Sequence, residues 1–155
     1  MSVFTTENDS FVALIKYGSL ILFKMVMMST VTSVYRVLHR SLTSEEDAYF
    51  AVGNNKEKQK KLLIEHPDVK RARLAHQNDL ENIVPFFLIS LLYISIKPEP
   101  KLTEFLFKVF AGSRILHSFV YIGKVRQPAR YLTFLCGFLI NVYMLVQIFR
   151  WAYVL

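Results

Sequence analysis

The stretch YLTFLCGFLINVYMLVQIF, residues 131–149, contains 19 residues and no charged side chain. A helix rises about 1.5 Å per residue, so about 20 apolar residues cross the roughly 30 Å hydrocarbon core of a bilayer. Trp151 and Tyr153 follow the stretch, at positions where aromatic rings typically lie in the membrane interface. The stretch therefore predicts a membrane-spanning helix and indicates the class of the whole chain.

Three further apolar blocks precede this stretch, separated by polar segments. We predict an all-α, integral membrane four-helix bundle that occupies residues 1–155 as one domain. Its helices are expected at approximately 10–37, 69–96, 102–123 and 130–150. Residues 38–68, approximately, are expected to form a polar cytosolic loop with one short helix capped by Ser44.

The charge distribution predicts the membrane topology. Almost half of the 19 Lys and Arg lie between Arg36 and Arg73, and three more lie at Lys124, Arg126 and Arg130. The positive-inside rule places both regions in the cytosol and both chain ends on the other side. The rule explains the net charge of +7 without nucleic acid. The lone Cys136 excludes an internal disulfide framework.

Several charged residues lie where lipid would surround a lone helix. Lys24 and Arg114 are near the middle of apolar blocks, and Glu81 comes just before one. A buried charge in a membrane needs a partner and is a functional candidate. We expect Arg114 to pair with Glu81, as an ion pair that stabilises the bundle, as the lining of a ligand site, or as both.

The polar residue types indicate a ligand. Arg side chains bind carboxylates, and Glu81 can bind an amine, so the set suits a small zwitterion. Arg114, His117 and Tyr121 share one helical face, and Arg130 opens the last helix next to Tyr121. His117 alone is more typical of a hydrogen-bonded core histidine. The spacing of the four His predicts no metal site.

Two motifs resemble the signature of the MAPEG superfamily, and the resemblance extends over essentially the whole chain. They are HQNDLENIVPF (residues 76–86) and RILHS (residues 114–118), followed by Tyr121 and QPAR (residues 127–130). The chain is most similar to the family's microsomal glutathione transferases and next to its microsomal prostaglandin E synthases. This implies a homotrimer in the endoplasmic reticulum or outer mitochondrial membrane, with glutathione bound between subunits near the cytosolic face.

The resemblance also implies the roles of individual residues. The implied glutathione-binding set is Arg36, Arg73, His76, Asn78, Glu81, Arg114, Tyr121 and Arg130. Arg130 and Tyr121 are the implied catalytic residues, with Arg130 beside the sulfur. Leu74 stands where relatives often have Arg, and Ala48 stands where some have a reactive Cys. Tyr131 and Phe134 depart from the synthase pattern.

Three functions follow as expectations. The first is a glutathione transferase that conjugates hydrophobic electrophiles, with peroxidase activity on lipid hydroperoxides. The second is a glutathione-dependent, prostaglandin E synthase-like isomerase. The third is a non-enzymatic membrane adaptor, whose buried charges only build the assembly.

Overall fold

The computed structural model describes residues 3–154, and within this range it contains six α-helices and no strand. The all-α prediction is therefore confirmed. The helices are α1 (Asp9–Leu38), α2 (Glu45–Val52), α3 (Lys56–Leu62), α4 (Pro67–Ser95), α5 (Pro100–Ile122) and α6 (Ala129–Tyr153).

Local sequence signals explain where the long helices begin. The side chain of Asn8 accepts from the N–H of Ser10 at the start of α1. Residues His66 and Glu99 cap α4 and α5, and each is followed by a proline in the first turn. Proline is favoured there because its missing N–H would have no partner inside the helix.

The segment between α1 and α4 contains two short helices, whereas one was expected. Ser44 caps α2 as predicted, and its side chain accepts from the N–H of Asp47. Gly53 ends α2 at a φ of +61°, a conformation that glycine adopts without strain. Asn55 then caps α3 through the N–H of Lys58. This second cap, beside a lysine-rich run, was the signal missed.

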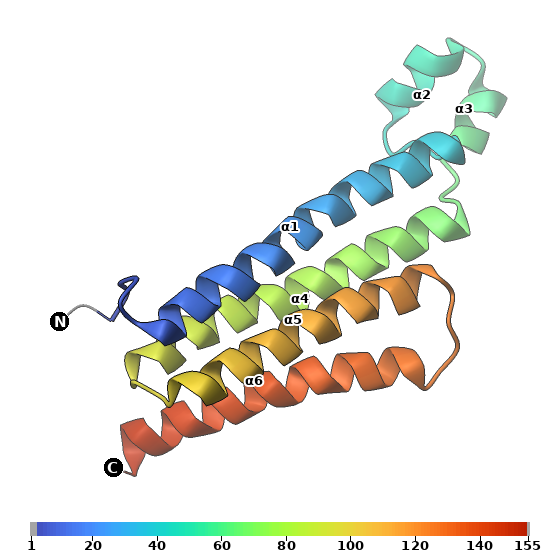
Figure 1. Cartoon of the computed structure of the whole chain (residues 1–155). Helices are drawn as coiled ribbons and strands as arrows, with labels where there is room; N and C mark the ends of the chain where they lie inside the picture. Colours follow the sequence, from blue (N-terminus) through green and yellow to red (C-terminus); the bar gives the residue numbers. More distant parts are fainter. Residues whose placement is uncertain (1–2, 155) are drawn as a thin grey trace.

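The four long helices run side by side, and α2 and α3 lie beyond one end of them (Figure 1). Both chain ends lie at the opposite end. Helix α1 packs against α4 and α5, and α6 packs against the same two helices. The ring order is therefore α1, α4, α6, α5, with α4 diagonally across from α5.

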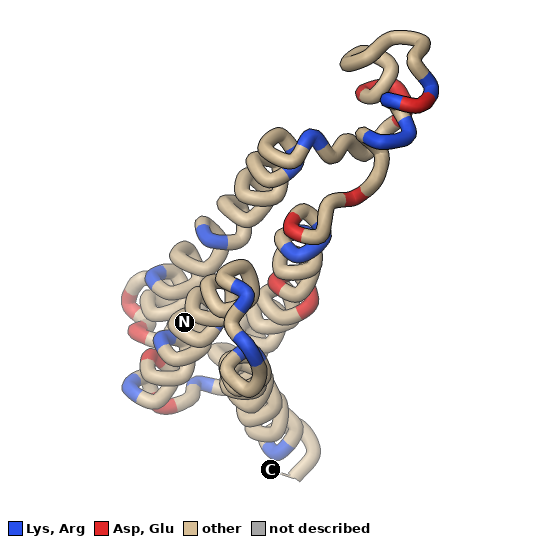
Figure 2. Tube along the Cα trace, turned by 90° about the vertical axis from the view of Figure 1, so that its right-hand side faces the viewer, with Lys and Arg blue, Asp and Glu red and all other residues tan. Residues whose placement is uncertain are grey.

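Lysine, arginine and acidic residues gather over α2 and α3 (Figure 2).

Three described helices, α1, α5 and α6, are long and apolar enough to cross a membrane. Helix α4 differs because its first half is polar, from Asp68 to Glu81, and its apolar run begins at Ile83. The membrane character of the chain is thus supported by three helices. A crossing by α4, and with it the four-helix membrane bundle, stays a prediction.

Aromatic side chains form the apolar core between α4 and α5. Phe86 stacks on Phe110 with ring centres 3.8 Å apart, and it meets Phe107 edge-on. Phe86, Phe107 and Phe110 are all fully buried. This core fixes α5 against α4 and sets the register of the polar residues beside it.

Candidate functional site

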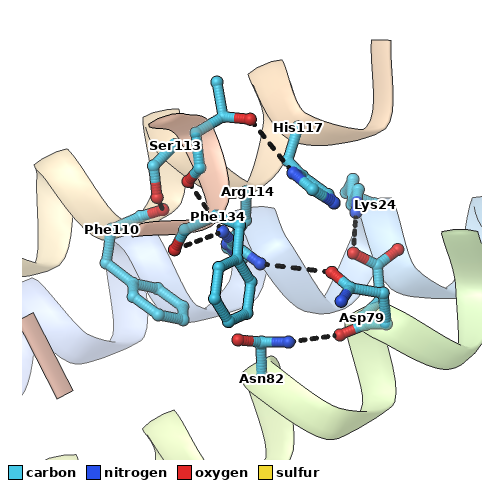
Figure 3. Close-up of polar contacts among 10 residues, drawn as sticks. Lys24, Asp79, Asn82, Phe110, Ser113, Arg114, His117 and Phe134 are labelled. Atoms are coloured by element: carbon cyan, nitrogen blue, oxygen red, sulfur yellow. Dashed lines mark hydrogen bonds and ion pairs between the residues drawn. The ribbon is translucent and has the colours of Figure 1, made fainter. Parts of the chain in front are cut away.

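Arg114 is the largest fully buried side chain of the described residues. Its Nη2 donates to the backbone carbonyls of Thr133 at 2.8 Å and Phe134 at 3.3 Å, both on α6. Its Nη1 lies 3.5 Å from the Oδ1 of Asn78 on α4, at the limit of a hydrogen bond. Arg114 therefore links three helices at one level (Figure 3).

The close approach of Arg114 to α6 depends on Gly137. A Cβ at position 137 would lie 3.0 Å from Arg114 Nε and 3.1 Å from Nη2. The guanidinium thus packs against bare backbone. This explains why its Nε is buried with no hydrogen-bond partner in the described part of the chain.

The acid buried next to Arg114 is Asp79, and the expected pairing of Arg114 with Glu81 is wrong. Asp79 is completely buried and forms an ion pair with Lys24 of α1 (Figure 3). Glu81 is exposed and accepts from the side chain of Gln77 at 3.1 Å. A charge at Lys24, in the middle of α1, was expected to need a partner, and the buried Asp79 is that partner.

Helical periodicity explains why Asp79 rather than Glu81 faces inward. Asp79 is followed at intervals of three and four by residues that are all buried in α4: Ile83, Phe86, Ser90 and Tyr93. Residues at this spacing share one helical face. Glu81 lies two positions along and projects to the other side. The apolar stripe was the signal that could have identified Asp79.

His117 is a hydrogen-bonded core histidine, as its sequence context favoured. Its Nδ1 lies 3.0 Å from the hydroxyl of Thr133, which donates to the backbone carbonyl of Ala129 or Arg130. The hydroxyl therefore accepts from Nδ1–H, which assigns the proton to Nδ1. The buried Nε2 has no partner among residues 3–154 and is left as an acceptor.

A hollow of about 210 Å³ lies beside this polar layer, between α4, α5 and the start of α6. We call it the α5–α6 pocket. Its lining residues are Asn78, His117, Tyr121, Gln127, Arg130, Tyr131 and Phe134. The guanidinium of Arg130 lies over the Tyr121 ring, 4.8 Å from its centre. The structure thus brings Asn78, Tyr121 and Arg130 together, with Arg114 reaching Asn78 from the interior.

The other four predicted site residues do not line this pocket. Arg36 lies in a separate hollow at the end of α1. Arg73 is paired with Glu65, 2.9 Å from Nε to Oε1, and this hydrogen bond holds the pKa of Glu65 below its usual range. His76 is half-buried with no partner for its Nδ1 among the described residues. Glu81 is exposed, as described above.

One group of possible metal ligands occurs in the described residues, although the spacing of the histidines predicted none. It consists of His39, His66 and Asp68. The two imidazole rings are stacked 3.7 Å apart and 7° from parallel, so their in-plane lone pairs do not converge. The ammonium of Lys124 lies 2.6 Å from Asp68. The group therefore acts as a polar junction between α1, α4 and the α5–α6 turn.

The α5–α6 pocket has the chemistry of an anion site. Arg130 borders it, and Arg114 lies behind Asn78 as a second cation. Neither arginine forms an ion pair with an acid among residues 3–154. Lys24 and Asp79 neutralise one another, so one unit of positive charge remains in the interior. A bound carboxylate or thiolate would balance that charge, and Asn78 and Tyr121 can donate hydrogen bonds to it.

Comparisons with known proteins find relatives over most of the chain. The model of the MAPEG family matches residues 14–150. Microsomal glutathione S-transferase 1 of Homo sapiens is 37% identical over 145 residues, which is 93% of this chain and 92% of the relative. The Bos taurus protein of the same name is 38% identical over the same shares. Prostaglandin E synthase of Homo sapiens is 31% identical over 117 residues, 76% of this chain and 73% of the relative.

Proposed function

The chain belongs to the MAPEG family, and we propose that it is a membrane-bound glutathione transferase that conjugates the glutathione thiolate to hydrophobic electrophiles. The observation that carries this proposal is the α5–α6 pocket, where Arg130 lies over Tyr121 beside Asn78. The relatives named glutathione S-transferases support the reaction and the co-substrate.

Arg130 is proposed to ionise the thiol. A free thiol has a pKa of about 8.5 and is mostly protonated at neutral pH, whereas the thiolate is the nucleophile. A guanidinium in a site of low dielectric favours the anion, and the released proton passes to water. Tyr121 holds the guanidinium in place through its ring and can donate its hydroxyl to the sulfur.

Two reactions of the thiolate are proposed. With an aryl chloride, the sulfur forms a bond to the ring carbon and chloride leaves. With a lipid hydroperoxide, the sulfur takes the terminal oxygen, and the lipid leaves as an alcohol. A second glutathione thiol then reduces the sulfenic acid, giving the disulfide and water. In both cases the hydrophobic substrate would reach the pocket from the bilayer.

The size of the pocket supports an assembly of several copies, and we propose the homotrimer that the family resemblance implies. A volume of about 210 Å³ is smaller than the roughly 300–1,000 Å³ of ordinary small-molecule sites. One chain therefore offers only part of a site for a tripeptide. We propose that the predicted residues outside this pocket, Arg36, Arg73, His76 and Glu81, complete the site of a neighbouring copy. We propose that glutathione binds at that subunit interface.

The location in the cell is also proposed. The names of the relatives favour the endoplasmic reticulum membrane, and the outer mitochondrial membrane remains a second expectation. The basic segments indicate that α2, α3 and the α5–α6 turn face the cytosol. The pocket lies at this end, where cytosolic glutathione has access.

Activity of the purified protein in detergent tests the proposal. We expect conjugation of a chlorodinitrobenzene-type substrate and saturable glutathione binding by calorimetry. Reduction of a fatty acid hydroperoxide tests the peroxidase reaction separately. Absence of conjugation and of glutathione binding would support the adaptor function instead. In that case Lys24, Asp79 and Arg114 would only stabilise the fold.

A prostaglandin E synthase-like isomerase is the second candidate, favoured by the 31% identity to the human synthase. Assay of an endoperoxide substrate under the same conditions decides between the two. Isomerisation faster than conjugation would favour the second function.

A further inference from the structure

Gln127 is a polar residue of the α5–α6 pocket to which neither the sequence motifs nor the proposed reaction gives a role. It lies in the turn between α5 and α6, three residues before Arg130, and its side chain is exposed. A glutamine amide has one acceptor oxygen and one nitrogen with two N–H donors. The end of the amide that can meet a ligand is the end that the protein itself does not use.

The oxygen of the Gln127 amide is used by α6. The backbone N–H of Tyr131 donates to Oε1 at 3.2 Å. An N–H group can donate only to the oxygen, so this contact fixes which way round the amide lies. Pro128, the capping residue of α6, provides no side-chain hydrogen bond. Gln127 therefore satisfies one of the N–H groups that the first turn of a helix leaves without a partner.

The nitrogen of the same amide is left for the pocket. Among residues 3–154, the hydrogen bond from Tyr131 is the one recorded for the Gln127 side chain. Nε2 therefore keeps both N–H donors, on a side chain that lines the pocket with Arg130 and Asn78. Donors of this kind match carboxylate and carbonyl oxygens. Glutathione carries two carboxylates and two peptide carbonyls around its thiol.

An amide at position 127 differs from the acid that would suit the helix alone. Acidic side chains are favoured at helix N-termini, because they accept from open N–H groups and interact well with the helix dipole. Glu99 does this at the start of α5, where it accepts from the N–H groups of Lys101 and Leu102. An acid at position 127 would also replace two donors with a negative charge at the wall of an anion site. Glutamine supplies the acceptor and keeps the donors.

We propose that Gln127 is a further glutathione-binding residue. The N–H of Tyr131 holds its Oε1, and its Nε2 donates to a carboxylate or carbonyl oxygen of the tripeptide. This role rests on the proposed transferase function and adds to it. Gln127 contributes to affinity for glutathione, whereas ionisation of the thiol is the role of Arg130.

Gln127→Glu separates ligand binding from helix capping. The variant keeps an acceptor for Tyr131 and adds a charge that a helix N-terminus favours, so capping alone predicts parent-like glutathione affinity and equal or higher thermal stability. The binding role predicts an affinity about 10-fold lower, because a hydrogen bond to the ligand is lost and its anionic groups are repelled. Calorimetry and thermal unfolding of the full-length protein in detergent measure the two quantities. Parent-like affinity of Gln127→Glu would overturn the assignment.

Val125→Glu is the matched control for charge. Val125 is 48% exposed in the same turn and does not line the pocket. The variant therefore adds the same charge without changing the amide, and it should bind glutathione within about twofold of the parent, since exposed charges interact weakly. Equal losses of affinity in Val125→Glu and Gln127→Glu would indicate repulsion at a distance and overturn the contact.

Gln127→Ala tests the contact without any added charge. It should raise the KM for glutathione about threefold to 10-fold, the contribution of one hydrogen bond, and leave kcat and its pH profile at saturating glutathione unchanged. A lower kcat with an unchanged KM would overturn the assignment. If the parent itself binds no glutathione, the proposed function fails. If the parent binds it and Gln127→Glu binds equally well, only the role of Gln127 fails.

Discussion

The guanidinium carbon of Arg130 lies 4.8 Å from the centre of the Tyr121 ring, and both side chains line the α5–α6 pocket. Arg130 lies in the first turn of α6, and Tyr121 is one residue from the end of α5. The contact therefore spans the turn between the two helices. It holds a positive charge at the pocket wall, and in the described part of the chain no acid forms an ion pair with Arg130.

Replacing Arg130 should raise the pKa of bound glutathione. We expect Arg130→Ala to lower kcat/KM at neutral pH by about 10-fold to 100-fold, since a nearby opposite charge typically shifts a pKa by one or two units. The deficit should shrink above the free thiol pKa of about 8.5, where the thiol ionises unaided. The pH profile of conjugation and the ultraviolet absorbance of the thiolate measure this.

Arg126→Ala is the matched control, because Arg126 is an exposed cation in the same turn and does not line the pocket. It should conjugate at nearly the parent rate across the same pH range. A uniform deficit of Arg130→Ala at every pH would contradict the thiolate role and indicate a role in binding or structure.

The Lys24–Asp79 pair should be one of the most sensitive positions for stability. The side chain of Asp79 is fully buried and that of Lys24 is 13% exposed. Lys24→Met leaves a buried carboxylate unpaired, which costs about 3–5 kcal/mol. The double variant Lys24→Met with Asp79→Leu should recover much of that loss, because it removes both charges. Thermal unfolding in detergent measures the difference.

An exposed pair on the same helix provides the comparison. Lys16 lies 3.5 Å from Glu104, and their side chains are 64% and 51% exposed. Lys16→Met should change the unfolding temperature much less than Lys24→Met. Similar effects of the two variants would show that burial of the Lys24–Asp79 pair has little energetic weight.

Gly137→Ala should disturb Arg114. The added methyl would lie 3.0 Å from Arg114 Nε, and the guanidinium is held by carbonyls on the same helix, so it has little room to move. We expect lower thermal stability and weaker glutathione binding, with Gly137→Val more severe than Gly137→Ala. Calorimetry of glutathione binding and thermal unfolding measure the two effects.

Gly112→Ala, on α5, is the matched control because a Cβ there meets nothing within 4 Å. It should be neutral or slightly stabilising, since alanine favours the helix more than glycine does. If both alanine variants behave alike, the tight contact at Gly137 does not position Arg114.

Local sequence patterns predicted the long helices because each has a clear apolar block. They could also have separated Asp79 from Glu81, because Asp79 shares the stripe of Ile83 and Phe86. The meeting of His39 with His66 could not have been predicted this way. It depends on how α2 and α3 bring the ends of α1 and α4 together, which is a long-range property of the fold.

In the α5–α6 pocket, too, some features follow from local sequence and others from the packing of distant segments. Arg114 and Tyr121 share a helical face, so their common orientation follows from their spacing. The contact of Arg130 with Tyr121 depends on the path of the turn between α5 and α6. The approach of Arg114 to α6 depends on the glycine at position 137. The sequence alone does not show which helix packs against this glycine, so its importance could not be predicted.

Acid should loosen the junction between α4 and the α5–α6 turn. Lys124 donates to Asp68 at 2.6 Å, and this hydrogen bond holds the pKa of Asp68 below its ordinary value of 3.8. A carboxylate with a lowered folded-state pKa contributes stability that is fully present above the unfolded value and lost as the pH falls through the folded value. Hydrogen exchange of residues 68–70 and 124–127 should therefore increase, relative to Lys124→Ala, as the pH falls below 3.8. Parallel pH dependence in the parent and Lys124→Ala would contradict this. In that case the Asp68–Lys124 contact would not hold the turn against α4.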